Sequence, residues 1–575
     1  MSGTLVSSLV WVPRGRASFA PKRYTLDDAE LERVGKLGGP EVLQQLRKEI
    51  EGIDVDGEDW EEVGEDDDSA SGSGSDVGSK QDGDVAMKES LKPRDPNDIS
   101  ALNMDDYDEE ESRGVAMGAF ANVKGLTFYR DNKEDPYITL KDDDDALERE
   151  ELTLLPTDTM LISGRTTSDL SSLDFHIYDE PNENLYVHHD LMLPSFPLCI
   201  EWLDFAGPSS TPGNHVAVGS FDPSIEIWDA DLIDGLYPHA ILGPSPSLEK
   251  PEARPLGTGK KKRRQLVQPT SNSEHHVQPV LSLSWSSNHR HLLLSGSADT
   301  TIKLWDLTRD SPMAAVRSWN GVHGEEKVQA VEWNKSGTNG LDKAVLSAGW
   351  DRVVRVWDSR SVEEGMGVKV GSDVECVRWD PWEPTSFYVS LENGLILAYD
   401  SRTLSSSKSK KTSLSESQPK YTLSAHDGAA AAFDVNPHIR GCLVTGGMDK
   451  TIKIWNVQDE ETEGMVGRKR EISLATSRDL GLVRFLSSSQ EVFVLADAAV
   501  QGKVFTARWS PDPETPLTLA AAGSKATVQV WDVASNPGAR KAFGERLRRH
   551  GRELGEMKKG GGIVGVEDDH EDEDD

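Results

Sequence analysis

The residues most able to do chemistry in this sequence are three sets, each made of a histidine, a hydroxyl residue and an aspartate. Such a set could activate its hydroxyl for nucleophilic attack, with the histidine as base and the aspartate as its orienting partner. With the tryptophan that follows each, the sets are His276, Ser295, Asp299 and Trp305; His323, Ser347, Asp351 and Trp357; and His426, Thr445, Asp449 and Trp455. Catalysis needs one such site and not three, so the repetition favours a structural hydrogen-bond network.

Other catalytic and metal-binding patterns are missing from the sequence. It contains no G-x-x-x-x-G-K-S/T, G-x-S-x-G or H-E-x-x-H motif and no Cys/His spacing typical of zinc. The run His188-His189-Asp190 could suggest metal ligands, but adjacent residues of a strand point to opposite faces of the sheet, so we expect ordinary strand histidines. We therefore predict a protein that is not an enzyme, with no catalytic residue, no cofactor and no metal.

The tryptophans of the three sets belong to a longer repeat. Seven strand-like segments end in an aromatic residue followed by Asp or Asn: FHIYD (175–179), IEIWD (225–229), IKLWD (302–306), VRVWD (354–358), ILAYD (396–400), IKIWN (452–456) and VQVWD (528–532). Six of them carry a turn residue six positions before the aromatic residue, namely Asp222, Asp299, Asp351, Asn393, Asp449 or Lys525. Small residues precede that turn, where neighbouring backbones must approach closely.

This spacing is the WD40 pattern, in which four-stranded blades surround a central channel. The sequence therefore predicts an all-β fold, a WD40 β-propeller with seven blades, in which each His/Ser or Thr/Asp/Trp set is a structural tetrad. The stretch 482–501 is apolar enough to form strands. It is either an insertion or an element of an eighth blade.

Composition divides the chain into five regions. We predict a docking motif and short helices (1–50), an acidic disordered linker (51–118), a lead-in or closing strand (119–151), the propeller (152–535), and a basic helix with an acidic tail (536–575). Flexible insertions enlarge the propeller near 243–275, 405–420 and 458–503. The linker is assigned as disordered because a segment so acidic cannot bury enough apolar area to fold alone.

The net charge of −37 disfavours wrapping of naked nucleic acid over the whole surface, so any nucleic-acid contact should be local. The three cysteines, Cys199, Cys376 and Cys442, lie in apolar strand-like runs and are expected to be reduced core residues of an intracellular protein. We expect neither a signal peptide nor a membrane span, and no small-molecule substrate.

Several stretches outside the repeats resemble the periodic tryptophan protein 1 family. They are WVPRG (11–15), DPYITLKD (135–142), LPTDTMLISGRT (155–166), NLYVHHDLMLPSFPLCIEWLDF (184–205), SRDLG (477–481) and AAAGSKATVQVWD (520–532). The resemblance implies a nucleolar WD40 scaffold in ribosome biogenesis that assists assembly of the large (60S) subunit and pre-rRNA processing.

The implied partners are large-subunit assembly factors and ribosomal proteins in pre-60S particles, together with contact to pre-rRNA. We expect a monomer within a larger complex, located in the nucleus and nucleolus. The alternative is a chromatin- or histone-binding WD40 regulator of rDNA transcription, because an acidic and aromatic channel could hold a basic tail.

Three turn residues are candidates for partner binding, because Phe221, Trp350 and Met448 are large and apolar immediately before the turn residue, where a turn needs nothing apolar. The alternative is packing under an adjacent inter-blade loop. Trp11 and Arg14 are further candidates, as a peptide that docks on another assembly factor or, alternatively, on its own propeller.

One basic run lies in the first insertion: Lys260, Lys261, Lys262, Arg263 and Arg264. It is a candidate for nuclear import or for RNA contact. The alternative is a solvated loop charge.

Overall fold

The computed structural model describes residues 4–25, 28–38, 152–168, 170–205, 212–244, 271–309, 313–337, 340–361, 365–406, 417–460, 469–479, 502–549 and 563–565. All of them belong to one compact unit, formed by residues 1–50 and 149–575. The predicted linker (51–118), the predicted strand at 119–151, the basic run 260–264 and the stretch 482–501 lie outside the described residues.

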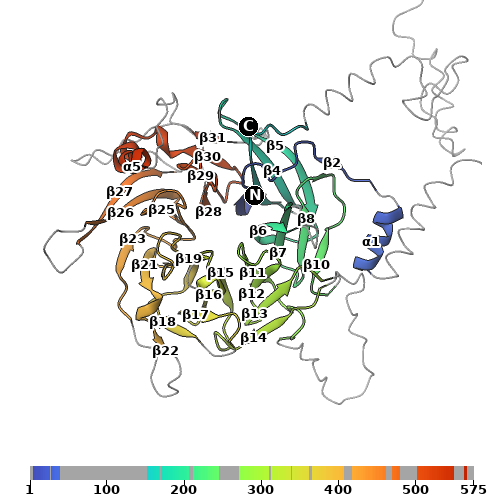
Figure 1. Cartoon of the computed structure of the whole chain (residues 1–575), viewed down its shortest axis with the longest axis horizontal. Helices are drawn as coiled ribbons and strands as arrows, with labels where there is room; N and C mark the ends of the chain where they lie inside the picture. Colours follow the sequence, from blue (N-terminus) through green and yellow to red (C-terminus); the bar gives the residue numbers. More distant parts are fainter. Residues whose placement is uncertain are drawn as a thin grey trace, which may run out of the picture. The chain divides into compact units, whose positions relative to one another are not determined.

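Seven antiparallel sheets form the blades of a propeller (Figure 1). From the inner to the outer strand, the first three blades are β1 (Leu5–Trp11), β3 (Thr159–Thr167), β4 (Leu170–Asp179) and β5 (Asn184–Leu193); β6 (Pro197–Phe205), β7 (Pro212–Ser220), β8 (Ile225–Asp229) and β10 (Ala240–Leu242); and β11 (Val280–Trp285), β12 (Leu292–Ser297), β13 (Thr301–Asp306) and β14 (Arg317–Asn320).

The other four blades follow in chain order. They are β15 (Val328–Trp333), β16 (Ala344–Gly349), β17 (Val353–Asp358), β18 (Met366–Lys369) and β22 (Ser405–Ser406); β19 (Val374–Trp379), β20 (Ser386–Leu391), β21 (Leu395–Asp400) and β23 (Tyr421–Ser424); β24 (Ala432–Val435), β25 (Cys442–Gly446), β26 (Thr451–Glu460) and β27 (Lys469–Asp479); and β28 (Val504–Trp509), β29 (Thr518–Gly523), β30 (Gln529–Asp532) and β31 (Ile563–Gly565). The predicted seven-bladed propeller is confirmed.

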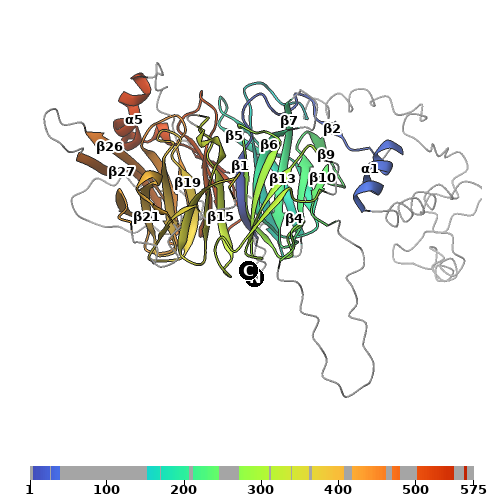
Figure 2. The same ribbon diagram turned by 60° about the horizontal axis from the view of Figure 1, so that its bottom comes forward.

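Short elements complete the described part of the chain. The helices are α1 (Asp28–Gly38) and α5 (Pro537–Arg549), with 3-10 turns η5 (Leu341–Lys343), η6 (Ser401–Thr403) and η7 (Val533–Ser535). Strand β2 (Lys22–Arg23) pairs in parallel with β9 (Leu232–Ile233). Figure 2 shows α5 beside β26 and β27.

The propeller is not confined to residues 152–535, the range that the sequence had suggested. Strand β1 comes from the N-terminal region and supplies the inner strand of the first blade, where it pairs with β3. It also contacts β28 and β29 of the last blade, so the inner strands touch in order around a closed ring. At the outer edge, β31 from the C-terminal region pairs with β30. Both ends of the chain therefore contribute strands, which remove open edges.

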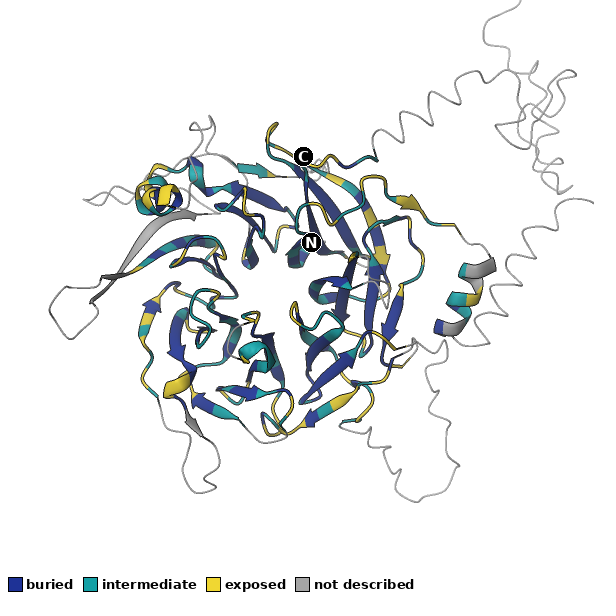
Figure 3. Ribbon diagram, viewed as in Figure 1, coloured by how far each residue is buried: buried dark blue, intermediate teal, exposed yellow. Residues whose placement is uncertain are grey.

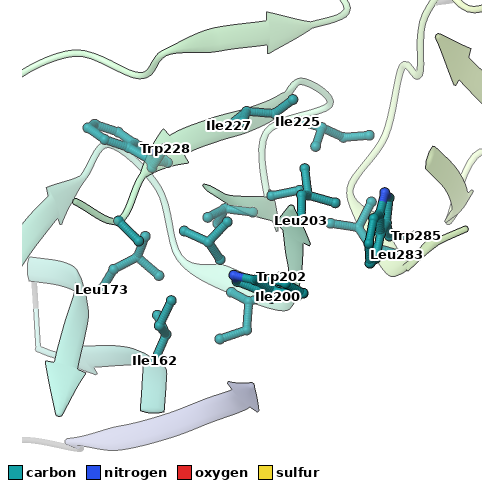
Figure 4. Close-up of a cluster of buried hydrophobic side chains, with 14 of the residues drawn as sticks. Ile162, Leu173, Ile200, Trp202, Leu203, Ile225, Ile227, Trp228, Leu283 and Trp285 are labelled. Carbon is teal, nitrogen blue, oxygen red and sulfur yellow. The ribbon is translucent and has the colours of Figure 1, made fainter. Parts of the chain in front are cut away.

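The core lies between neighbouring blades, since buried residues concentrate in the strands (Figure 3). In the cluster of Figure 4, the indoles of Trp202 and Trp285, from the inner strands of two consecutive blades, meet edge to face with centroids 5.7 Å apart. Elsewhere in the ring, small residues let strands of neighbouring blades approach each other closely. A Cβ added at Gly446 would lie 2.6 Å from Cγ1 of Val504 in the next blade.

Parts of the second and third predicted insertions are ordered in strands. Residues 405–406 form β22, which joins the outer edge of the preceding blade rather than a loop. In the third insertion, β26 and β27 pair from Thr451 to Asp479 as one long hairpin. The predicted basic helix is present as α5, and Ala539, Phe543 and Leu547 bury its inner face.

We predict that Leu9→Ala in β1 lowers the free energy of unfolding by about 2–5 kcal/mol, because Leu9 is fully buried between the first and last blades. Urea denaturation of the full chain measures this. Lys22→Ala, a truncation of an exposed side chain in the same N-terminal region, is the control and should change stability by less than about 0.5 kcal/mol. Equal stability of the two variants would show that β1 does not help to close the ring.

Candidate functional site

The tetrad of the third blade is a continuous buried network. Nδ1 of His276 lies 2.9 Å from Oδ2 of Asp299, and Nε2 lies 2.7 Å from Oγ of Ser295. Nε1–H of Trp305 donates to the same Oγ at 2.8 Å. The network also contains Thr301, which sequence reasoning did not include, and its hydroxyl donates to Asp299 Oδ1 at 2.6 Å. The tetrad thus joins the loop before the blade to its second and third strands.

Protonation in this tetrad follows from burial and hydrogen bonding. Burial lowers the pKa of His276, so the ring is neutral and its Nδ1–H donates to Asp299. Burial alone would raise the pKa of Asp299, but the hydrogen bonds from His276 and Thr301 outweigh it and lower the pKa to about 2. The pair is therefore a neutral imidazole bound to a carboxylate, which is a charge-assisted hydrogen bond.

The other two predicted tetrads have the same connections. His323 bridges Asp351 and Ser347 at 2.9 Å each, and Trp357 Nε1–H donates to Ser347 Oγ at 3.0 Å. In the sixth blade, His426 lies 3.0 Å from Asp449 and 2.8 Å from Thr445, and Trp455 donates to Thr445 Oγ1 at 3.0 Å. The hydroxyl groups of Ser295, Ser347 and Thr445 are buried inside the blades, where no substrate could reach them.

Trp350 lies next to a tetrad aspartate but points outward. It occupies the turn between β16 and β17, on the face of the propeller that carries the turns before the third strands, which we call the upper face. Its side chain is 47% exposed. Nε1–H donates to Oε1 of Gln329 at 3.2 Å, and Nζ of Lys327 lies 4.6 Å from the ring centroid. These two contacts hold the indole in one orientation while leaving half of it in solvent.

The other two apolar turn residues differ from Trp350. Phe221 is 56% exposed, and its ring lies 5.3 Å from that of Phe196 in the loop before β6. Met448 is only half-buried, with its Cβ close to Gly428, in the loop before β24. The three residues belong to alternate blades, the second, fourth and sixth, so the structure does not gather them into one patch.

Trp11 and Arg14 contact the propeller itself, so the expectation that they dock on another protein is wrong. Trp11 is 5% exposed, and its Nε1–H donates to the backbone oxygen of Arg508 in the last blade at 3.0 Å. The Arg14 guanidinium forms ion pairs with Asp512 at 2.9 Å and Glu514 at 2.7 Å. The alternative, self-docking, is the observed arrangement, because an inner strand leaves its own tryptophan facing the neighbouring blade.

The pair His188-His189 has a different geometry from the one expected for adjacent strand residues. The register between β4 and β5 shifts between Phe175 and His176, which leaves His188 as a bulge residue. The two Nδ1 atoms lie 2.8 Å apart, and His189 stacks on Phe175 with centroids 4.2 Å apart. Burial lowers the pKa of both rings, that of His189 to about 3. Across the described residues, no group of three or more His, Cys, Asp or Glu side chains could hold a metal ion.

Sequence reasoning missed a set of carboxylates that join the blades near the channel. Glu201 Oε1 accepts from the backbone N–H of Trp285 in the next blade at 3.3 Å. Glu332 accepts from Trp379 N–H at 2.6 Å, and Asp434 from Trp509 N–H at 3.0 Å. For Glu201 and Glu332 the signal was present in the sequence, since each directly precedes the tryptophan of an inner strand, Trp202 or Trp333. Asp434 lacked it, because the residue that follows it, Val435, takes the position of Trp333 in the sheet register.

The link at Glu332 is reinforced by charge. The Arg378 guanidinium lies 3.5 Å from Glu332 and 3.6 Å from Asp434, and so bridges three blades. Arg508 continues the series, 3.8 Å from Asp434. Burial raises the pKa of Glu332 to about 7, although Arg378 opposes that shift. The inner strands therefore carry an alternating belt of acidic and basic side chains.

Of the three cysteines, which were expected in the core, Cys442 is buried and Cys199 and Cys376 are half-buried. Cys199, Cys376 and Cys442 are free thiols. Burial raises the pKa of all three, which keeps them protonated. In the part of the chain that the structure describes, no helix is both long and apolar enough to cross a membrane.

We predict that Asp351→Ala lowers the free energy of unfolding by about 1–3 kcal/mol, because it leaves the buried Nδ1 of His323 and the N–H of Val353 without their acceptor. Asp373→Ala is the matched control. It removes a carboxylate of the upper face that pairs with the exposed Arg352, so the decrease should stay below about 1 kcal/mol. Chemical denaturation measures both. Equal decreases would contradict a structural role for the tetrad.

Comparison with known proteins gives both local and full-length matches. The family model described as "WD domain, G-beta repeat" matches residues 268–306, 316–358 and 417–456, which are the three tetrad blades. An uncharacterized WD repeat-containing protein of Schizosaccharomyces pombe is 36% identical over 98% of this chain and 95% of its own length. A shorter match is to the ribosome biogenesis protein WDR12 homolog of Aedes aegypti, 29% identical over 28% of this chain and 36% of that protein.

The match that decides the family covers nearly all of both chains. Periodic tryptophan protein 1 of Saccharomyces cerevisiae is 30% identical over 94% of this chain and 90% of its own length. Because the similarity extends far beyond the repeats, shared WD40 patterning alone does not explain it. The chain belongs to the periodic tryptophan protein 1 family of WD-repeat proteins.

Proposed function

We propose that this protein is a non-enzymatic WD40 scaffold of ribosome biogenesis that assists large (60S) subunit assembly and pre-rRNA processing. The observation that carries the proposal is its full-length membership of the periodic tryptophan protein 1 family. The partial match to a protein named for ribosome biogenesis supports it. In this proposal the protein acts in the nucleus and nucleolus, where large-subunit assembly factors, ribosomal proteins and pre-rRNA are its partners.

The geometry supports binding rather than turnover. The arrangement that resembles a catalytic site, the His/Ser or Thr/Asp set, is repeated in three blades, and its histidine and its hydroxyl residue are buried in each. Its hydroxyl groups are committed to the indole and imidazole of the same blade. The upper face instead offers Trp350, an exposed indole held in place by Lys327 and Gln329. A rigid aromatic side chain loses little conformational entropy on binding, which suits it as a contact for a partner protein.

The import or RNA role of residues 260–264 stays a proposal on the sequence alone, since they lie outside the described residues. Within the proposed function, import by this basic run would bring the protein to the nucleus. The same charges could then contact phosphate, because the two roles act at different times.

The proposed function predicts which RNA accompanies the protein. Affinity purification of the tagged full chain, followed by sedimentation and RNA sequencing, should recover large-subunit rRNA precursors in particles larger than the free protein. A chain carrying Leu9→Ala, with its ring closure weakened, should recover less. Enrichment of nucleosomes without those precursors would overturn the proposal and favour the chromatin-binding alternative.

We predict that Trp350→Ala removes at least one protein partner from these particles while the melting temperature stays within about 2 °C, because the indole contacts Gln329 and Lys327 at the exposed surface rather than the core. Leu236→Ala is the control, since Leu236 is also a large exposed apolar residue but lies elsewhere on the propeller. Quantitative mass spectrometry of the purified particles compares the two variants. A fall of several degrees for Trp350→Ala, with partners retained, would instead indicate a structural role.

A further inference from the structure

Three exposed arginines share one arrangement: Arg360 and Arg402 follow the third strands β17 and β21, and Arg440 lies in the loop before β25. In blade 5, Arg402 pairs with Asp400 at 2.6 Å, and the guanidinium is 72% exposed whereas the carboxylate is 7% exposed. Arg440 pairs with Glu383 at 2.6 Å, and here too the guanidinium is more exposed than the carboxylate, 59% against 29%. Arg360 and Asp358 repeat it in blade 4. In each pair the guanidinium is more exposed than its carboxylate, although Asp358 is itself 38% exposed.

These arginines lie on one side of the propeller, opposite the upper face, and are linked by contacts. Arg317 donates to the backbone oxygens of Ser359 and Arg360, which joins the third blade to the fourth. η6, which holds Arg402, continues into β22 at the edge of blade 4. Glu383 accepts from both Lys420 and Arg440. The positive groups thus follow the rim from blade 4 to blade 6.

Helix α5 extends the same series over the last two blades. Arg546 donates to the backbone oxygen of Arg440 and to Asn456, which fixes the helix next to that arginine. With Phe543 and Leu547 buried, the opposite face presents Lys541, Arg548 and Arg549 to solvent. The acidic residue on that face is Glu545, paired with Arg549 at 2.8 Å. The helix therefore presents a net positive surface although the chain as a whole carries −37.

We propose that this rim, defined by Arg360, Arg402, Arg440, Lys541, Arg548 and Arg549, binds the phosphate backbone of an RNA duplex. The choice of RNA rests on the proposed function, but the choice of phosphate rests on the chemistry of the rim. Guanidinium groups present a planar fork of N–H donors that fits phosphate oxygens, and every residue of the rim except Lys541 is arginine. Asp358 and Asp400 accept from Nε and Nη2 of Arg360 and Arg402, which fixes each guanidinium in place and leaves its Nη1 amino group to contact phosphate.

An RNA duplex fits the rim better than an acidic protein segment does. The positive groups are spread along an arc over consecutive blades, and a polyanion with regularly spaced charges can contact several of them at once. Recognition would be independent of base sequence, because the rim offers cations rather than groups that read base edges. The strongly negative chain limits phosphate binding elsewhere, so contact should be confined to this arc.

The test uses the full chain with a fluorescently labelled RNA duplex of about 20 base pairs, and anisotropy is measured from about 50 to 300 mM salt. The variant Lys541→Gln/Arg548→Gln/Arg549→Gln removes three charges from the exposed face of α5 and keeps good helix formers there. We expect affinity to fall at least about fivefold at about 150 mM salt, and the slope of log K against log salt to decrease by about two. Each phosphate that the variant no longer neutralises should reduce the steepness of this slope by roughly 0.7–0.9.

The matched control, Lys450→Gln/Lys503→Gln/Lys525→Gln, removes the same charge from exposed positions on the upper face. It should leave affinity within about twofold, and both variants should melt like the natural protein. Equal decreases in affinity for the two variants would overturn the proposal, as would no binding by the natural protein or a preference for an acidic peptide over the duplex. This assay uses purified components, so it tests duplex binding by the rim alone. The role in ribosome assembly is tested separately, by the rRNA precursors that accompany the protein in purified particles.

Discussion

The structure depends on closing a ring of seven inner strands, and that closure is made by β1. Val6, Leu9 and Trp11 pack in one cluster with Ala520, Ala522, Val528 and Val530 of the last blade. The hydrogen bond from Trp11 to Arg508 spans 497 residues of sequence. Without β1 the first blade would lack its inner strand and the last blade would expose its apolar face. The contacts between β1 and the last blade join residues nearly 500 positions apart, as in the bond from Trp11 to Arg508, so they carry a high loop-closure entropy and form after most of the propeller.

Two separate sets of polar side chains hold this ring together, one within the blades and one between them. Within a blade, the tetrads join loops to strands through hydrogen bonds between a histidine ring and an aspartate carboxylate. Between blades, carboxylates at Glu201, Glu332 and Asp434 accept backbone N–H groups from the next inner strand. Because a buried carboxylate is costly unless its oxygens are bonded, each such link fixes both partners in place. The result is a rigid frame, on which surface residues such as Trp350 can be held in one orientation.

The two faces of this frame carry different chemistry. The upper face holds isolated apolar side chains on alternate blades, which suits contacts with proteins. The opposite rim holds arginines that are more exposed than their carboxylate partners, which suits contact with phosphate. A scaffold that joins proteins and RNA needs these surfaces to be separate, since a partner on one face then leaves the other accessible.

The sequence by itself determined the blades, their number and the tetrads, because each of these depends on residues close to one another along the chain. The spacing from His276 to Ser295, Asp299 and Trp305 is enough, since two adjacent strands and one loop fix the geometry. Tertiary structure alone decided the role of Trp11, the ring closure by β1 and the match of Val435 with Trp333. It also decided that the arginine, and not the carboxylate, is the more exposed member of a pair such as Arg402 and Asp400. Those features depend on partners in other blades or on the relative burial of two charged groups, and neither is encoded in local spacing.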